Sequence, residues 1–316
     1  MMQVQAHRGP DDAHIVRFPG CLLGFNRLSI LDLSLLGRQP MKVEGSAAAI
    51  VFNGEIYNFV ELAEELATRG ISLRSRSDTE ILLHSYLMEG EASLSRLNGM
   101  FAWAVFDPTN ETLFTARDRF GEKPLYYFKN DDHFCFASEI KALLELPFVP
   151  RKPDLVTLFG AGFGRGNDRS ERTCFEGIRQ LLPSHSLRIV RSSWSARTRR
   201  YWSIPLSDHG SPPNPSHDLE SHEEEFRALL RSAVSIRLRS DRPVGLLLSG
   251  GVDSSSIAAM IATLHKDSGG PGRSEVPRLF TMSLPGELVD EAPVALDTAR
   301  FLGLPCQEIR GESPHF

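Results

Sequence analysis

The feature that most constrains the fold is a run of apolar residues, 246–248, that leads into two glycines and a helical pattern. Gly250 and Gly251 allow the backbone to turn sharply and to approach an anion closely. Apolar residues then recur at helical spacing between 257 and 264. The N-terminus of such a helix presents unpaired N–H groups and the positive end of a dipole. We therefore predict a strand, a turn and a helix, with the turn binding the phosphates of a nucleotide.

Side chains in the turn agree with this interpretation. Hydroxyl groups at Ser249, Ser254 and Ser255 can donate hydrogen bonds to phosphate oxygens. Asp253 would repel phosphates unless a divalent cation lay between them, so we expect Mg²⁺ at this carboxylate. The Walker pattern with its lysine is absent from the sequence, which argues against an ordinary γ-phosphate hydrolase. The alternative is a Gly-Gly turn that only joins a strand to a helix.

Length and composition indicate two soluble domains. The chain has 316 residues, 41% hydrophobic and 24% charged, and no apolar run is long enough to cross a bilayer. The net charge of −5 gives no reason to expect nucleic-acid binding. Residues 207–221 contain three prolines and four serines. We expect them to be a linker between a first domain, 1–206, and a second domain, 222–316.

The two predicted domains differ in their patterns. In the first, short runs rich in aromatic residues, leucine and valine alternate with turns and two helical stretches, which predicts an α+β domain. Its expected strands are 20–33, 47–52, 101–106, 112–117, 125–128, 134–137, 186–190 and the stretch around 201–202, and its expected helices are 59–69 and 79–89.

In the second domain, helices and strands alternate, which predicts a parallel sheet. Ligands of such sheets bind outside the carboxyl ends of the strands, where we expect both Ser249 and Ser283. The expected helices, besides the one after the glycines, are 222–239 and 290–302, and the expected strands are 244–248, 279–283 and 306–309.

The cysteines indicate the compartment. Cys21, Cys135, Cys174 and Cys306 are far apart and form no C-x-x-C pair, and the sequence begins without a signal-peptide pattern. This favours a reducing cytoplasm over disulfides or a zinc site.

Eight short segments of the first half carry a distinctive series of residues: His7–Asp12, Arg27–Asp32, Gln39–Met41, Phe52–Asn58, Ser77–Glu80, Leu97–Ala102, Ala116–Gly121 and Lys123–Tyr127. In this order they resemble the class II glutamine amidotransferase domain of the glutamine-hydrolysing asparagine synthetase family. The turn at 249–255 resembles the pyrophosphate loop of the ATP-pyrophosphatase group, whose members form adenylates. The resemblance covers nearly the whole chain. It implies an Ntn-type four-layer αββα domain followed by a Rossmann-like α/β ATP-pyrophosphatase domain.

The resemblance also implies roles for individual residues. Arg27 matches the position that binds the α-carboxylate of glutamine, and Asp78 the position that binds its α-ammonium group. Asn53 and Gly54 match the oxyanion hole, and Glu55 is a further substrate contact. The simpler alternatives are a surface salt bridge for Arg27, a helix cap for Asp78 and a turn at Asn53-Gly54.

For the second domain, the resemblance implies an ATP site. The strand that ends at Leu248 would line the adenine pocket, with the phosphates in the turn and Ser283 on the next strand. ATP and Mg²⁺ are the expected cofactors, and glutamine, aspartate and ATP are the expected small-molecule substrates. The resemblance leaves a homodimer open.

Two segments of the family pattern have no counterpart here. The family begins with a nucleophilic cysteine, whose own α-amine is the base, and it ends with a Ser-Gly-Glu-Gly segment and a catalytic lysine. This sequence starts Met1-Met2-Gln3 and stops at Phe316, and its four cysteines lie in other contexts. We therefore expect both domains to be incomplete and the chain alone to form no asparagine from glutamine.

The reaction implied for the complete enzyme is ATP-dependent amidation of aspartate. A β-aspartyl-AMP intermediate would react with ammonia from glutamine, giving asparagine, glutamate, AMP and pyrophosphate. Three alternatives stay open. They are a ligase like β-lactam synthetase, an amide ligase of natural-product assembly, and a non-catalytic binding fragment.

Overall fold

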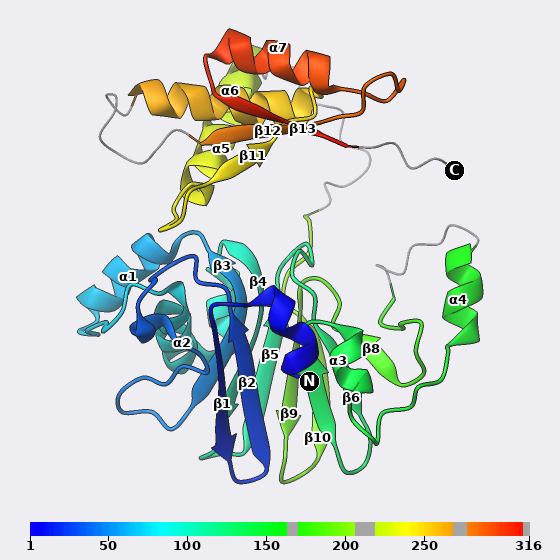
Figure 1. Ribbon diagram of the computed structural model, residues 1–316. Helices are drawn as coiled ribbons and strands as arrows, with labels where there is room; N and C mark the ends of the chain where they lie inside the picture. The colour runs from blue at the N-terminus through cyan, green and yellow to red at the C-terminus, as the bar shows by residue number, and fades with distance from the viewer. Residues whose placement is uncertain (163–169, 206–218, 268–276, 312–316) are drawn as a thin grey trace. The chain divides into compact units, whose positions relative to one another are not determined.

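The computed structural model describes residues 1–162, 170–205, 219–267 and 277–311. They belong to two compact units, Met1–Leu206 and Ser207–Phe316, which are treated separately below (Figure 1). None of the helices in the described ranges combines the length and apolarity that a membrane crossing requires.

An antiparallel sheet forms the centre of the first unit. A hairpin turn follows Asp107 and joins two of its paired strands, and in it the Asp107 carboxylate accepts a hydrogen bond from the Thr109 N–H (2.9 Å). The last strand was predicted around 201–202 but lies at 195–200. In sheet order, the five strands are β10 (Ser195–Arg200), β9 (His185–Val190), β5 (Thr112–Arg117), β4 (Gly99–Asp107) and β3 (Ala49–Ile56).

Helices α1 (Phe59–Thr68) and α2 (Asp78–Glu89) cover one face of this sheet (Figure 1). Side chains of a strand alternate between faces, so Phe52 of β3 points to these helices and Val51 to the opposite face. Trp103 of β4 is 1% exposed and lies in the same helix-facing core. The predicted helices at 59–69 and 79–89 are therefore confirmed to within a residue at each end.

A second β layer packs on the opposite face of the central sheet. Leu23 and Tyr127 from this layer share a core with Val51 and Ala104 of the central sheet. On its outer side, helix α3 (Ile140–Leu144) contributes Leu143 to another core. The unit therefore has the expected αββα order of layers. The strands of the second layer are β1 (Asp12–Phe18) and β2 (Cys21–Arg27), paired with each other, and β7 (Phe134–Ala137), β6 (Tyr126–Lys129) and β8 (Ile178–Gln180).

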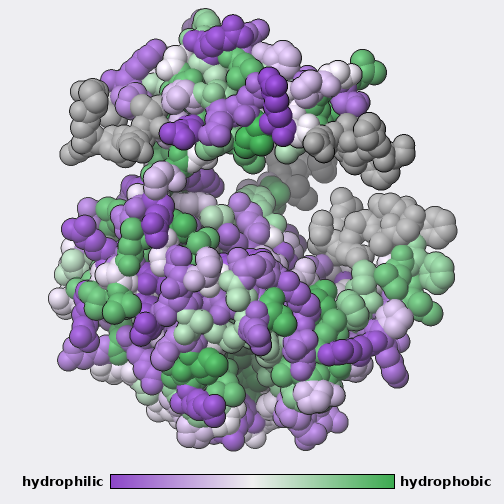
Figure 2. Space-filling view, in the orientation of Figure 1, coloured by the Kyte–Doolittle hydropathy of each residue, from purple (hydrophilic) through white to green (hydrophobic). Residues whose placement is uncertain are grey.

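Short helices complete the first unit. Helix α4 (Leu155–Gly162) exposes Leu155, Val156 and Phe159, and Figure 2 shows this apolar surface at the right-hand edge of the unit. The 3₁₀ helices are η1 (Gln3–Arg8), η2 (Leu35–Gly37) and η3 (Gly90–Ser95).

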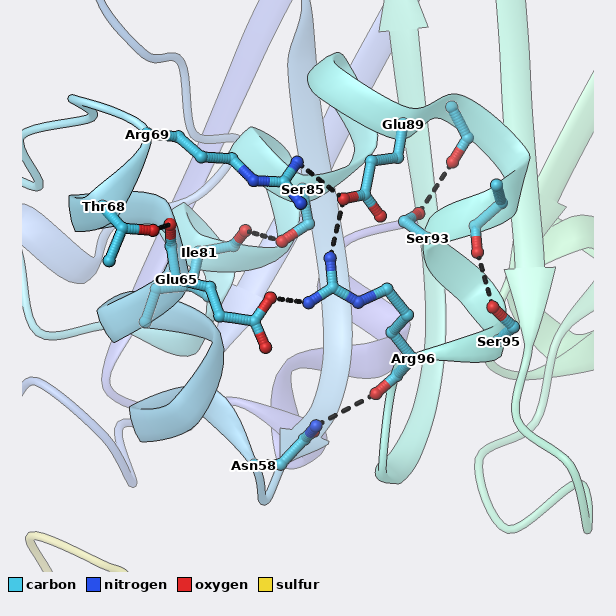
Figure 3. Close-up of polar contacts among 12 residues, drawn as sticks. Asn58, Glu65, Thr68, Arg69, Ile81, Ser85, Glu89, Ser93, Ser95 and Arg96 are labelled. Atoms are coloured by element: carbon cyan, nitrogen blue, oxygen red, sulfur yellow. Dashed lines mark hydrogen bonds and ion pairs between the residues drawn. The ribbon is translucent and has the colours of Figure 1, made fainter.

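Ion pairs join α1, α2 and the segment after η3. Figure 3 shows the Arg96 guanidinium between Glu65 of α1 and Glu89 of α2, with Arg69 also bound to Glu89 at 2.9 Å. The Arg96 to Glu89 distance is 2.6 Å. Because the Arg96 side chain is 31% exposed, solvent screens these pairs, and their contribution to stability is modest.

In the second unit the described strands form a parallel sheet, as predicted, and they follow one another across it in sequence order. Leu248, Ile261, Leu279 and Ala295 form part of its core. Its elements are α5 (Leu219–Arg237), β11 (Gly245–Leu247), α6 (Val252–Asp267), β12 (Arg278–Ser283), α7 (Ala292–Leu302) and β13 (Cys306–Arg310).

The expected linker at 207–221 needs a correction at its end. Helix α5 already begins at Leu219, so 219–221 belong to the helix, whereas 207–218 lie outside the described residues. Leucine, glutamate and serine at 219–221 precede the apolar helical stripe, and sequence periodicity alone did not extend the helix to them.

Candidate active site

Strand β3 places three candidate residues in succession at its carboxyl end. Asn53, Gly54 and Glu55 lie opposite residues 100–102 of β4. Gly54 has a φ of 152°, and a Cβ atom there would lie 2.1 Å from the Met100 carbonyl oxygen. Only glycine fits this contact, because any side chain would collide with the main chain of β4. The simpler alternative of an Asn-Gly turn is wrong, since both residues are within a strand.

Arg27 ends strand β2 and is only 6% exposed, so it is not the surface residue of the simpler alternative. Its Nη1 donates to the carbonyl oxygen of Ser34 (2.8 Å), and its Nη2 donates to that of Asp32. No carboxylate of the described residues lies within ion-pair distance of Arg27, although its charge, after burial and hydrogen bonds, is one of the influences on the pKa of the Asp32 carboxyl. A guanidinium has five N–H donors, so this buried cation keeps donors for a bidentate bond to a carboxylate.

Asp78 is the first residue of α2 and is 5% exposed. Its Oδ2 accepts a hydrogen bond from the Ile56 N–H at 2.9 Å, which ties it to the end of β3. Burial raises the pKa of the Asp78 carboxyl, because the charged form has lost its water. Ser77, not Asp78, caps the helix by accepting from the Thr79 N–H (3.2 Å). Asp78 is therefore a buried carboxylate at the first position of the helix, and Ser77 occupies the cap position.

The Glu55 carboxyl is buried near Asp78 and has a raised pKa for the same main reason. Burial raises the pKa of its carboxyl, the nearby Asp78 charge raises it further, and Lys123 acts in the opposite direction. The two carboxylates therefore lie close enough to interact. An ammonium group between them would favour the charged form of both.

Two residues outside the predicted set fix the strand and the helix. Gln39 accepts from the Phe52 N–H (2.6 Å) and donates to the Thr79 hydroxyl (3.1 Å), which joins β3 to α2 directly beside the candidate residues. The Asn53 side-chain amide lies 3.5 Å from the Ser138 hydroxyl oxygen. Gln39 stood within the segments that carry the family resemblance, but sequence alone gave it no role.

Three of the four cysteines are not activated nucleophiles. Burial raises the pKa of Cys21 and of Cys135 to about 11, and it also raises the pKa of Cys306. These three thiols are protonated near neutral pH and react slowly. None of the four cysteines, all of which the structure describes, forms a disulfide.

In the second unit, the turn between β11 and α6 has the expected geometry. Gly250 has a φ of 81°, and a Cβ there would lie 3.0 Å from the Val294 side chain of α7. The hydroxyl oxygens of Ser249 and Ser254 lie 3.1 Å apart, and the Ser254 hydroxyl is also within 3.3 Å of the Ser249 N–H. The turn therefore gathers two hydroxyl groups at the N-terminus of a 16-residue helix.

The other predicted phosphate-site residues lie nearby in the fold. Leu248 is 2% exposed and follows β11, and its N–H donates to the Phe280 carbonyl oxygen on β12 (2.8 Å). Ser283 ends β12, the parallel neighbour of β11, so it stands at the same edge of the sheet as Ser249. The Ser283 hydroxyl lies 3.4 Å from the Asp290 carboxylate.

Asp253 lies in the first turn of α6 and is exposed. The described residues contain no cluster of three or more histidine, cysteine, aspartate or glutamate side chains that would hold a metal by itself. One carboxylate at a phosphate turn still suits Mg²⁺, which is commonly held by one or two carboxylates together with substrate phosphates.

Comparison with known proteins agrees with both units. Residues 1–202 match the family model described as glutamine amidotransferase domain, and residues 225–313 match the one described as asparagine synthase. The chain is 38% identical over 265 residues to asparagine synthetase [glutamine-hydrolyzing] 3 of Bacillus subtilis, covering 83% of this chain and 42% of that protein.

Two further relatives have similar sequence identity to this chain. Amidase chyE of Penicillium rubens is 35% identical over 316 residues, covering 96% of this chain and 45% of the relative. A putative asparagine synthetase [glutamine-hydrolyzing] 2 of Methanocaldococcus jannaschii is 34% identical over 277 residues, covering 81% of this chain and 52% of the relative. The chain thus spans about half the length of the curated relatives it matches. From the layers, the site and these matches, the chain belongs to the glutamine amidotransferase family, among the members that continue into an asparagine synthase region.

Proposed function

We propose that this chain provides the glutamine site and the nucleotide turn of a glutamine-hydrolysing asparagine synthetase. Two buried groups of opposite charge carry the proposal. Arg27 is a buried cation and Asp78 a buried anion, and neither forms an ion pair with a described residue. The Asp78 charge is unfavourable in its buried position, as its raised pKa indicates, and a zwitterionic α-amino acid would place an ammonium group beside Asp78 and a carboxylate beside Arg27.

Bound glutamine would use each group in a definite way. Its α-carboxylate would take the remaining Arg27 donors, and its α-ammonium group would lie between Asp78 and Glu55. The side-chain amide would then extend toward Asn53 and Gly54. There the Asn53 side-chain N–H and the Gly54 main-chain N–H would stabilise the oxyanion that forms when a nucleophile attacks the amide carbon. Hydrolysis releases glutamate and ammonia.

In the second unit we infer an ATP site at the turn. Leu248 would line the adenine pocket, and the hydroxyls of Ser249, Ser254 and Ser255 would bind phosphate oxygens at the N-terminus of α6. Mg²⁺ bound at Asp253 would neutralise the departing pyrophosphate. ATP adenylates the β-carboxylate of aspartate, and ammonia then displaces AMP to give asparagine. Ser283 at the neighbouring strand end would contact the same nucleotide.

Aspartate as the acceptor, a homodimer and a cytoplasmic location are finer parts of the proposal. Aspartate is supported by the names of relatives, and one similar relative is named an amidase, so the acceptor needs its own assay. Size-exclusion chromatography with light scattering tests the dimer. The absence of disulfides among the four cysteines supports a reducing compartment.

Calorimetric titration of the purified chain with L-glutamine tests the first site. We expect saturable binding, at least about tenfold weaker binding in R27K because lysine lacks the planar fork, and unchanged binding in R38K. Arg38 is the matched control because it pairs with Asp12 at the surface (2.7 Å). Wild-type protein without saturable binding, or R27K with wild-type affinity, would overturn the proposed site.

The nucleotide turn is tested separately. We expect ATP to bind more tightly with Mg²⁺ than with a chelator, and D253N to lose this difference. Formation of AMP and pyrophosphate from ATP and ammonium is then compared with aspartate and with other carboxylic acids as acceptors. If the affinity for ATP is the same with Mg²⁺ and with a chelator, and the same in D253N, the proposed metal site at Asp253 is wrong.

A further inference from the structure

Asp32 lies between the two charged anchors of the candidate glutamine site. It is 8% exposed, and its φ of 52° places it in the left-handed region. Its carbonyl oxygen accepts from the Arg27 guanidinium, and its Oδ2 accepts from the Arg76 N–H at 2.9 Å. One residue therefore contacts the cationic anchor through its main chain and the approach to α2 through its side chain.

The contacts on the Arg27 side form a closed loop. Asp32 Oδ1 accepts from the N–H (3.0 Å) and the hydroxyl (2.5 Å) of Ser34. The Ser34 carbonyl oxygen in turn accepts from Arg27 Nη1 at 2.8 Å. Burial acts to raise the pKa of the Asp32 carboxyl, but hydrogen bonds from Ser34 and Arg76 outweigh it and hold the pKa below its ordinary value. The bridge is therefore charged near neutral pH.

The contacts on the other side lead directly to Asp78. Arg76 precedes Asp78 by two residues, and Ser77 between them caps α2. A bond that fixes the Arg76 main chain also fixes the start of α2, where the Asp78 carboxylate is oriented by Ile56. Asp32 is thus the common support of two groups that lie 51 positions apart in the sequence, at 27 and 78.

We propose that Asp32 is a positioning residue that sets the separation between the Arg27 guanidinium and the Asp78 carboxylate, and so selects ligands that carry a carboxylate and an ammonium group on one carbon. The inference rests on the proposed glutamine site. Once one group of such a ligand is bound, the other group is already held close to its own anchor, so the second contact forms at a high effective concentration. A ligand with only one of the two groups gains nothing from the fixed separation. Asp32 therefore acts on selectivity more than on either contact alone.

The test substitutes Asp32→Asn. Asparagine tolerates the left-handed conformation and has nearly the same shape. Its amide nitrogen is a donor, however, and it would face either the Arg76 N–H or the Ser34 donors, so one side of the bridge is lost. Asp107→Asn is the matched control, because Asp107 also accepts a main-chain N–H in a turn but lies at the far end of β4.

Three ligands are titrated into each variant: L-glutamine, glutaramate, which lacks the ammonium group, and 4-aminobutanamide, which lacks the carboxylate. Ligand-observed NMR measures the affinities of glutaramate and 4-aminobutanamide, which bind more weakly than glutamine. We expect D32N to weaken glutamine binding at least about tenfold, while the two single-anchor ligands change by less than about threefold. D107N should leave all three affinities unchanged.

The outcomes separate the inference from the proposal on which it rests. If D32N loses affinity equally for all three ligands, Asp32 only supports the fold. If D32N binds glutamine as the wild type does, Asp32 has no role in binding. Either result overturns the inference. Wild-type protein that does not bind glutamine overturns the proposed site as well. Should D32N fail to fold, D32G replaces it, because glycine adopts the same φ without strain and removes only the carboxylate. The same selectivity loss is expected.

Discussion

Replacing Asp78 with asparagine should make the protein more stable and a poorer binder. The change removes the charge of a carboxyl group that is 5% exposed, while an oxygen remains to accept from the Ile56 N–H. In the protein without ligand, this charge is unfavourable, because burial raises the pKa of Asp78 above its ordinary 3.8. The bound ammonium group of glutamine is what would make the charge favourable.

The sign of the effect with pH follows from the raised pKa. The folded state holds a proton on Asp78 at pH values where the unfolded chain has already released it. The free energy of unfolding therefore falls as the pH rises from the unfolded pKa to the folded one. Glu55 acts in the same direction from its ordinary 4.5. Asparagine removes the contribution of Asp78 and lowers the pKa of Glu55, whose raised value partly reflects the Asp78 charge.

The magnitude follows from the cost of a shifted pKa. Each unit by which a pKa is raised corresponds to about 1.4 kcal/mol at pH values above both pKa values. Relaxation of the site and the loss of one acceptor oxygen reduce the gain. We therefore expect the free energy of unfolding of D78N to be about 1–2 kcal/mol higher than that of the wild type near pH 8. Near pH 4 the folded wild type is already protonated at this position, and the difference should nearly vanish.

Urea denaturation followed by tryptophan fluorescence measures the difference at both pH values. D131N, a change of the same kind at an exposed loop residue, is the control and should have no effect. Added L-glutamine should stabilise the wild type and not D78N. A D78N protein that is less stable than wild type near pH 8, or equally affected at both pH values, would refute the argument that burial makes this charge unfavourable.

Two further predictions concern other parts of the fold. Gly250→Ala should lose about 1–2 kcal/mol in thermal unfolding and weaken ATP binding, because its φ of 81° is strained for alanine and the new methyl group meets Val294; Gly251→Ala, whose Cβ would meet only a hydroxyl oxygen at 3.5 Å, should lose less than about 0.5 kcal/mol. Arg96→Met should cost only about 0.5–1 kcal/mol in urea denaturation, because its two ion pairs are partly exposed, and a loss of several kcal/mol would contradict the modest role given to that network.

Several strands of the first unit could be predicted because their sequence signals are local. Strand β5 at 112–117 and strand β7 at 134–137 have the bounds that the sequence predicted. Each is a short apolar run bounded by turn residues, so the alternation and the turn agree. The parallel sheet of the second unit was predictable for the same reason, because strands and helices alternate there.

Elements without such a signal were missed. Every residue of β10 is exposed, and three of its six are arginines, so neither alternation nor apolarity marks it as a strand. Strand β1 has no buried residue either and is held by its pairing with β2. Helix α4 is apolar but exposed, and its pattern has no polar face. In these places, pairing with neighbours decides the structure, and one sequence window does not contain those neighbours.

The candidate site divides in the same way. Family resemblance predicted Arg27, Asn53 to Glu55 and Asp78, but gave no reason why they should meet. The structure adds Gln39 and Asp32, whose side chains bond to main-chain atoms far along the sequence. Such bonds leave no periodic trace in the sequence, and an aspartate in a loop is typical of any turn.

The fixed separation of Arg27 and Asp78 explains both the unfavourable Asp78 charge in the unliganded site and the selectivity proposed for that site. Asp78 is buried and its raised pKa shows that its charge is unfavourable there, whereas the charge of the buried Arg27 is near enough to the Asp32 carboxylate to affect its pKa. If Arg27 and Asp78 could approach each other, they would form a salt bridge and the site would close to ligands. Asp32 bonds to the Arg27 side chain and to the main chain before Asp78, which holds the two groups in place. A ligand of matching charge and spacing would relieve the Asp78 charge and bind the remaining Arg27 donors, so its binding should stabilise the first unit more than its contact area alone would suggest.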